Sequence, residues 1–299
     1  MGTSWSARIV GGDPQAALAI ARQILGKVIA EMSHWEPDSA LSRLNRAPIG
    51  SWQRLPPALV AVLASAWQVA EASGGAFDPA IGALVDLWGF GPSGPRTAPP
   101  PGETIEATHA AAGLDAFEFD PLLLRARRLR DARLDLSGIA KGYAVDALAD
   151  ALHAAGHADL LVEIGGEFVG CGLRPDGQPW WVAVEPLPGA ALPPLRIAAH
   201  DIAIATSGDY RRSFTADGRR YAHTLDPRTG HPIAHGTASV TVLAANCRHA
   251  DAWATVLTVL PPEEACAWAT AHSLAARIVR RSGHSVEEWF SPALRAMLG

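Results

Sequence analysis

Apolar residues recur with the spacing of an α-helix in several segments of the chain. A stripe of apolar positions at this spacing predicts a helix that buries one face. Proline after a capping residue, as in Asp13-Pro14, predicts a helix start, and Gly74-Gly75 or Gly156 predict helix ends. Asn246 is a suitable N-cap for the last of these helices. The predicted helices span residues 14–32, 57–71, 141–155 and 246–257.

Short apolar or alternating runs predict strands between these helices. Asp217-Gly218 predicts a hairpin turn, because both residue types tolerate the positive φ angles of a tight turn. Residues 33–45 are expected to be rich in turns, and the Pro- and Gly-rich stretch 91–102 to be a surface loop. Strands are expected at 4–10, within 117–136, and at 160–164, 168–171, 181–184, 195–198, 202–205, 210–215, 219–224, 239–243 and 275–279. This mixture predicts an α+β fold with mostly antiparallel sheets and flanking helices.

The composition narrows the class of protein. With 299 residues and 48% hydrophobic residues, the chain is long enough for one domain or for two lobes with a sizeable core. A net charge of −5 with no long run of one sign does not suggest nucleic-acid binding. No run is long and apolar enough for a transmembrane helix. The three scattered cysteines do not form a disulfide framework or a zinc motif.

The first residues lack the basic flank and the apolar stretch of a signal peptide. The sequence as written therefore predicts a cytoplasmic protein, and a periplasmic one if a leader has been removed.

Four segments carry residues suited to chemistry, and each also has a purely structural interpretation. The Gly-Gly-Ala-Phe-Asp-Pro stretch at 74–79 allows close backbone approach, or closes a helix. Residues 134–142 lead into a helix N-terminus, which suits phosphates, although Asp135 or Ser137 as a plain N-cap explains them equally well. Gly165-Gly166 marks either a β-bulge or a place where a ligand lies against bare backbone. In the structural interpretation, the neighbouring acids Glu163 and Glu167 are simply solvated.

The fourth segment places His223 at a strand end, followed by a turn at residues 226–230. Histidine is the usual general base near neutral pH, but a single histidine is more often structural. His231, His235 and His249 are interpreted as surface residues. The sequence has no G-x-S-x-G elbow, no H-E-x-x-H motif and no Rossmann G-x-G-x-x-G joining a strand to a helix, which disfavours hydrolase, zinc protease and nicotinamide functions.

Asp251 and Thr255 lie four residues apart on the last predicted helix, so their side chains share one face. A carboxylate and a hydroxyl are ligands that Mg²⁺ prefers. A solvated polar face is the structural alternative.

Taken together and in this order, these segments resemble the ApbE family of FAD:protein FMN transferases. The resemblance rests on Met1-Gly2-Thr3, on residues 32–39 and 41–45, on 74–79, 135–142 and 165–167, and on 223–230 and 250–255. It implies an ApbE-like, T-fold-related architecture in a single flavin transferase domain, 1–299, or in two lobes with the FAD site between them. It also implies an Mg²⁺-dependent transfer of FMN from FAD to a Thr or Ser hydroxyl of an acceptor flavoprotein, with release of AMP.

The resemblance also implies a role for individual residues. His223 matches the family's proposed base toward the acceptor hydroxyl. Trp35 stands where the family often has Tyr, and Lys141 where some members have Glu. The expected FAD contacts are Met1, Trp35, Ala76, Phe77, Asp78, Asp135, Lys141 and Leu225. The expected Mg²⁺ ligands are Asp251, Thr255 and the backbone carbonyl of Gly138.

Two other functions are compatible with the same sequence. An Mg²⁺-dependent FAD pyrophosphatase would use the same residues, with water in place of the acceptor hydroxyl. A non-catalytic FAD-binding protein would need neither a base nor a metal, so the presence of His223, Asp251 and Thr255 argues against it.

Overall fold

The computed structural model describes residues 2–283 and 285–298. The chain divides into two compact units. One unit, termed the loop unit, contains residues 28–138 and 211–234. The other, termed the sheet unit, contains residues 2–27, 139–210 and those from His235 onward. Within the described residues, none of the helices has the length and apolarity needed to cross a bilayer.

A seven-stranded antiparallel sheet forms the core of the sheet unit, in the order β1-β5-β6-β9-β14-β15-β16. Its strands are β1 (Trp5–Ile9), β5 (Leu160–Ile164), β6 (Glu167–Cys171), β9 (Ile202–Gly208), β14 (Thr237–Ala244), β15 (Ala275–Ser282) and β16 (Ser285–Phe290). The predicted α+β class with mostly antiparallel strands is therefore confirmed. Gly165 and Gly166 form the tight turn between β5 and β6, with φ of 65° and 96°. The glycine pair is thus a hairpin turn, which only residues tolerant of positive φ can form.

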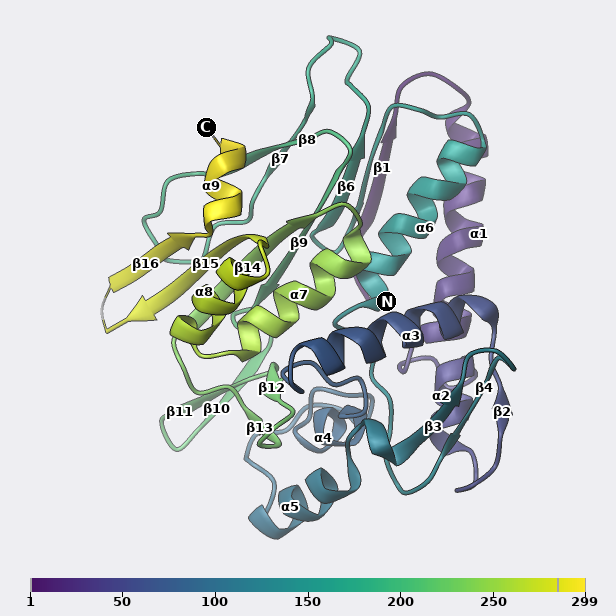
Figure 1. Ribbon diagram of the computed structural model, residues 1–299, viewed down its shortest axis with the longest axis vertical. Helices are drawn as coiled ribbons and strands as arrows, with labels where there is room; N and C mark the ends of the chain where they lie inside the picture. Colours follow the sequence, from purple (N-terminus) through teal and green to yellow (C-terminus); the bar gives the residue numbers. More distant parts are fainter. Residues whose placement is uncertain (1, 284, 299) are drawn as a thin grey trace. The chain divides into compact units, whose positions relative to one another are not determined.

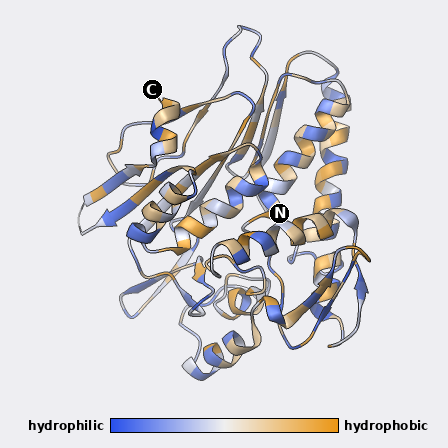
Figure 2. Ribbon diagram, in the orientation of Figure 1, coloured by the Kyte–Doolittle hydropathy of each residue, from blue (hydrophilic) through white to orange (hydrophobic). Residues whose placement is uncertain are grey.

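Two helices, α6 (Ala140–Ala154) and α7 (Cys247–Val259), pack on this sheet and on each other (Figure 1). Hydrophobic and hydrophilic bands alternate along both helices, as expected when one face is covered and another meets solvent (Figure 2). The hairpin of β7 (Trp180–Ala183) and β8 (Arg196–Ala199) packs with α9 (Pro292–Leu298) in a hydrophobic cluster that includes Leu161, Ile204 and Leu243. Helix α8 (Pro262–Ala271) follows α7. Helix α1 (Pro14–Met32) contributes residues to both units.

The loop unit consists of short elements around a second hydrophobic cluster. Its helices are α2 (Ala40–Arg46), α3 (Pro57–Ala72), α4 (Gly82–Leu87), α5 (Gly102–Ala111) and the 3₁₀ turn η1 (Leu114–Ala116). Its strands are β2 (Gln53–Arg54), β3 (Phe117–Asp120), β4 (Arg125–Arg128), β10 (Ser213–Ala216), β11 (Arg219–Ala222), β12 (Leu225–Asp226) and β13 (His231–Pro232). Trp88, Phe90 and Leu225 are buried together, and Phe214 and Tyr221 pack against them. This cluster therefore connects the β10–β11 hairpin with the α4 region.

The prediction of a turn-rich segment at 33–45 is wrong for its second half, because α2 begins at Ala40. Ser39 caps this helix by accepting the backbone N–H of Ser42 at 3.0 Å. The four predicted long helices and the hairpin at Asp217-Gly218 are confirmed. Asn246 does cap α7, since its side-chain oxygen accepts the backbone N–H of His249 at 3.0 Å.

Candidate functional site

The expected flavin contacts of the loop unit differ widely in exposure. Trp35 is 47% exposed, which is unusual for so large an apolar ring and leaves a face available for stacking. Ala76, Phe77 and Leu225 are buried, so their side chains serve the packing of the unit. Met1 lies outside the described residues.

The stretch at 74–79 begins as a helix end, in agreement with its structural interpretation. Gly74 and Gly75 both adopt positive φ, 59° and 82°, directly after α3. The Ser73 hydroxyl then accepts the backbone N–H of Phe77 at 3.1 Å, and the Asp78 carboxylate accepts that of Ala80 at 2.7 Å. Burial raises the pKa of Asp78 to about 6, against this lowering hydrogen bond. Asp78 therefore changes protonation close to the neutral range.

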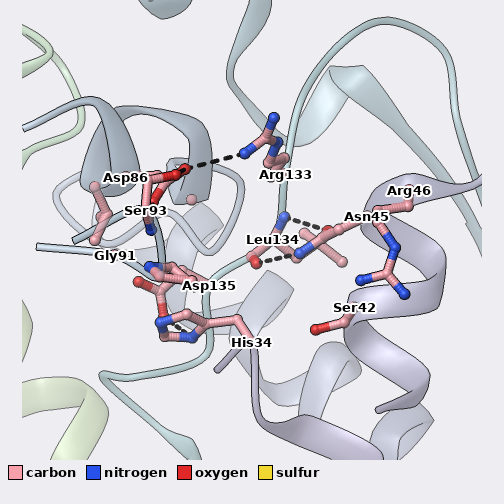
Figure 3. A pocket seen from close by; sticks show the side chains of 13 residues that line it. His34, Ser42, Asn45, Arg46, Asp86, Gly91, Ser93, Arg133, Leu134 and Asp135 are labelled. Carbon is pink, nitrogen blue, oxygen red and sulfur yellow. Dashed lines mark hydrogen bonds and ion pairs between the residues drawn. The ribbon is translucent and has the colours of Figure 1, made fainter. Parts of the chain in front are cut away.

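Asp135 lines a pocket of about 300 Å³ in the loop unit (Figure 3). Its carboxylate accepts the N–H and the hydroxyl of Ser137 at 2.8 and 2.6 Å, and it lies 3.3 Å from Nδ1 of His34. Asp135 and Ser137 therefore form a local turn. The N-cap interpretation is wrong, because the N-cap position of α6 is Ile139, where no side chain caps the helix. Nε2 of His34 is buried and has no hydrogen-bond partner among the described residues, so a polar ligand in this pocket would satisfy it.

The position of Asp135 is fixed through its neighbour Leu134. The side-chain amide of Asn45 donates to the Leu134 carbonyl at 2.8 Å, and its oxygen accepts the Leu134 N–H at 2.7 Å. These two hydrogen bonds join Asn45 and Leu134, which are 89 residues apart in the sequence (Figure 3). Sequence reasoning included Asn45 in the family resemblance but missed this role. An asparagine at the end of a short helix gives no sign of a backbone partner so distant.

His223 follows β11 directly and is oriented by Arg212. The backbone N–H of His223 donates to the Arg212 carbonyl at 3.1 Å, and Nδ1 of the ring lies 3.1 Å from the same oxygen. Since a carbonyl can only accept, this contact favours a proton on Nδ1 and leaves the lone pair on Nε2. The guanidinium of Arg212 lies 5.5 Å from the ring centre of Trp35. The structure thus brings His223 and Trp35 to the same arginine.

The turn that follows His223 is held from two sides. Trp88 donates its indole N–H to the Gly230 carbonyl at 3.0 Å, and Nε2 of His109 lies 2.8 Å from the Pro227 carbonyl. Inside the turn, Asp226 accepts the backbone N–H of Arg228 at 2.9 Å. These contacts fix the backbone beyond His223 and limit its freedom to move.

Lys141, Asp251 and Thr255 belong to the sheet unit, on the helices α6 and α7. Asp251 is buried, accepts the backbone N–H of Gly142 at 2.9 Å, and has an oxygen 3.7 Å from Nζ of Lys141. Lys141 also forms an ion pair with Glu167. Burial alone would lower the pKa of Lys141, but Asp251 and Glu167 outweigh it and raise that pKa. For Asp251 the effect of burial is the larger one: it raises the pKa of the carboxyl group, although the charge of Lys141 lowers it.

The ion pair of Glu167 was not foreseen. Its side chain is only 1% exposed, so the interpretation of this acid as a solvated residue is wrong. The residue lies just after the β5–β6 turn, where an acid in a sequence looks like part of a surface hairpin. Of the three histidines interpreted as surface residues, His231 is exposed, but His235 and His249 are partly buried. His235 also lies 2.9 Å from the Val259 carbonyl, and burial lowers the pKa of His249.

The donor atoms at Asp251 and Thr255 suit a hard cation. The Thr255 hydroxyl donates its proton to the Asp251 carbonyl at 3.2 Å, which leaves its lone pairs for a ligand. The third expected ligand, the Gly138 carbonyl, belongs to the loop unit. The described residues contain no group of three or more His, Cys, Asp or Glu side chains arranged for a metal. Within the sheet unit, Asp251 and Thr255 would offer a cation one carboxylate and one hydroxyl oxygen, donor types that fit Mg²⁺.

Comparisons of the sequence and of the fold with known proteins point to the same family. A model of the ApbE family matches residues 1–278. The FAD:protein FMN transferase of Klebsiella pneumoniae is 33% identical over 305 residues, which cover 100% of this chain and 87% of that protein. The apo structure of the Pseudomonas stutzeri flavinyl transferase ApbE superposes with a TM-score of 0.93 at 36% identity, covering 100% of this chain and 94% of that one. The Vibrio cholerae flavin transferase ApbE gives a TM-score of 0.91 at 33% identity, with 99% and 96% covered. By sequence and by fold, the chain belongs to the ApbE family.

Proposed function

We propose that this protein is an FAD:protein FMN transferase, which moves FMN from FAD to a Thr or Ser hydroxyl of an acceptor protein. The names of its relatives support this activity. The observation in this chain that carries most weight is the orientation of His223, whose Nδ1 and backbone N–H both contact the Arg212 carbonyl, which favours the tautomer with the proton on Nδ1. A protein that only stored FAD would have no need of an oriented base.

In the proposed reaction, Nε2 of His223 takes the proton from the acceptor hydroxyl as its oxygen attacks the FMN phosphorus. A bond forms between that oxygen and phosphorus, and the bond from phosphorus to the oxygen of AMP breaks. AMP leaves with the electron pair, and the acceptor keeps FMN through a phosphodiester. The donors at Asp251, Thr255 and Gly138 would hold Mg²⁺, which supplies charge neutralisation on the pyrophosphate and on the leaving AMP.

Other residues of the chain would position the substrate. The exposed ring of Trp35 offers a stacking surface for one of the ring systems of FAD. Asp78 and Asp135 offer carboxylates for hydrogen bonds. Lys141 lies beside Asp251, where a cation favours the ionised carboxylate and attracts phosphate oxygens. Correct placement accounts for much of the rate in this type of phosphoryl transfer.

The test is an incubation of the protein with FAD, Mg²⁺ and a candidate acceptor, followed by a denaturing gel viewed for flavin fluorescence. A fluorescent acceptor band is the expected result. Free FMN and AMP without labelled acceptor would instead identify an FAD pyrophosphatase, and unchanged FAD would identify a binding protein.

A further inference from the structure

A continuous strip of aromatic rings and arginines crosses the loop unit from the β10–β11 hairpin to Trp35. Tyr221 stacks on Phe214, with ring centres 5.0 Å apart, and Phe214 stacks on Phe90 at 5.9 Å. Phe90 contacts the ring of His223 edge-on at 6.3 Å. Arginines cover both ends of the strip: the Arg219 guanidinium lies 5.2 Å from the Tyr221 ring, and Arg212 lies over Phe90 and Trp35. The hairpin is therefore packed against the same side chains that surround the proposed base.

The hairpin also has an edge suited to an added strand. Its sheet contains β10 and β11 alone, so β11 has β10 on one side and no strand on the other among the residues described. An extended peptide can add to such an edge through main-chain hydrogen bonds. His223 comes directly after β11, so a peptide along this edge would run toward the base.

The charge of the hairpin region differs from that of the whole chain. Residues 211–220 contain four arginines, all exposed, and a single acid, Asp217, while the chain carries a net charge of −5. The four are Arg211, Arg212, Arg219 and Arg220. An exposed cluster of one sign attracts a partner of the opposite sign and speeds its association.

We infer that the β10–β11 hairpin is the docking surface for the acceptor protein, which lies along β11 as an extended segment with acidic residues near the reacting hydroxyl. This inference rests on the proposed transferase activity. A strand rises about 3.3 Å per residue, which places the backbone of Arg220 about 10 Å and that of Arg219 about 13 Å from that of His223. Such a span suits a polypeptide, since FAD phosphates that react beside His223 would not extend along the strand. The acidic residues are therefore expected three and four residues from the reacting Thr or Ser.

Two synthetic peptides test this surface. One has a single central threonine with aspartates three and four residues away on both sides, and the other has asparagines at those positions. Binding of each is measured by fluorescence anisotropy, with FAD and Mg²⁺ present, to the unaltered protein, to the double variant R219E/R220E and to R196E. Arg196 is the matched control, because it is also an exposed arginine on a two-stranded hairpin, β7–β8, but in the sheet unit.

The acidic peptide is expected to bind the unaltered protein more tightly than the asparagine peptide, and to lose about 10-fold or more in affinity for R219E/R220E. R196E should bind it normally, and FAD affinity should stay the same in both variants, with melting temperatures measured to verify that each is folded at the assay temperature. Hydrogen exchange at residues 213–222 should slow when the peptide binds. Failure of the acidic peptide to bind, equal affinity for both peptides, or an equal loss in R196E would overturn the docking surface.

Mass spectrometry of the same peptides tests the docking surface and the proposed transferase activity separately. A bound acidic peptide whose threonine never gains FMN would support the docking surface and count against the transferase. FMN attached equally well by R219E/R220E would support the transferase and overturn the docking surface.

Discussion

At the scale of single residues, the contacts of His223 and Asp78 have the clearest consequences. His223 is held by the backbone and ring contacts with the Arg212 carbonyl, which orient a base. Asp78 is placed where burial, and not a charged partner, dominates its protonation. For each residue, a chemical role and a structural role predict different results when the residue is replaced.

Replacing His223 with alanine should lower the rate of FMN transfer about 100-fold or more, the usual scale for a positioned base. FAD affinity should change only a few-fold, because the ring serves the reacting phosphorus and the acceptor. Rate, FAD dissociation constant and melting temperature are measured on the one variant. Trp35→Ala is the contrasting variant: loss of stacking should weaken FAD binding by roughly 1–3 kcal/mol with a smaller effect on saturating rate. A His223 variant that is destabilised but turns over normally would assign the residue a structural role.

Asp78→Asn should make the protein more stable above pH 6 and no more stable below pH 3.8. The folded-state pKa of about 6 exceeds the ordinary 3.8, so the stability that protonated Asp78 contributes is lost as the pH rises through about 6. Asparagine keeps the acceptor for the Ala80 N–H without the buried charge. Urea unfolding of both proteins across this range measures the difference, expected to be about 3 kcal/mol above pH 6 for a shift of this size. A constant difference at every pH would contradict the raised pKa.

At the scale of elements, two contacts between distant segments hold the site residues in place. One is the pair of hydrogen bonds from α2 to residue 134, and the other is the close packing of α6 on α7. Each contact is tested by a substitution at one position, Asn45 for the first and Gly142 for the second.

Asn45→Ala should remove both hydrogen bonds to Leu134 and leave its backbone groups partly unsatisfied. The expected cost in stability is about 1–3 kcal/mol. Because Asp135 is the next residue, FAD affinity should fall as well. Asn45→Asp keeps the acceptor for the Leu134 N–H and loses the donor to the Leu134 carbonyl. Its stability should therefore lie between that of the unaltered protein and that of Asn45→Ala. FAD titration beside denaturant unfolding checks this, and full FAD affinity in a destabilised Asn45→Ala variant would separate α2 from the flavin site.

Gly142→Ala should destabilise the protein by about 1–3 kcal/mol, because α6 and α7 leave no room for a side chain. A Cβ at this position would lie 2.3 Å from the Cys247 carbonyl oxygen. The shift of α7 should also displace Asp251, whose carboxylate accepts the Gly142 N–H. Gly26→Ala is the matched control in helix α1, since nothing lies within 4 Å of its added Cβ. Calorimetry should show that variant to be as stable as the parent or more so, and equal melting temperatures for the two variants would refute the packing argument.

At the scale of the whole molecule, the periodic patterns predicted the long helices and most strands of the central sheet. They failed where a helix is short, as at α2, since seven residues carry too little periodicity and the Ser39 cap decides the conformation. They also failed for Glu167 and Asn45, whose partners are distant in sequence. Local patterns contain no information about such partners, whereas the resemblance to a family did point to the segments that carry them.

The central claim is the transfer of FMN to a protein hydroxyl, and intact-mass measurement of an acceptor after incubation with FAD and Mg²⁺ tests it most directly. The account predicts an added mass of one FMN less one water, with one AMP released per acceptor labelled, and no added mass with Asp251→Ala. An acceptor of unchanged mass while FAD is split to FMN and AMP would contradict the transferase. Normal labelling by Asp251→Ala would contradict the role of Asp251 as a metal ligand.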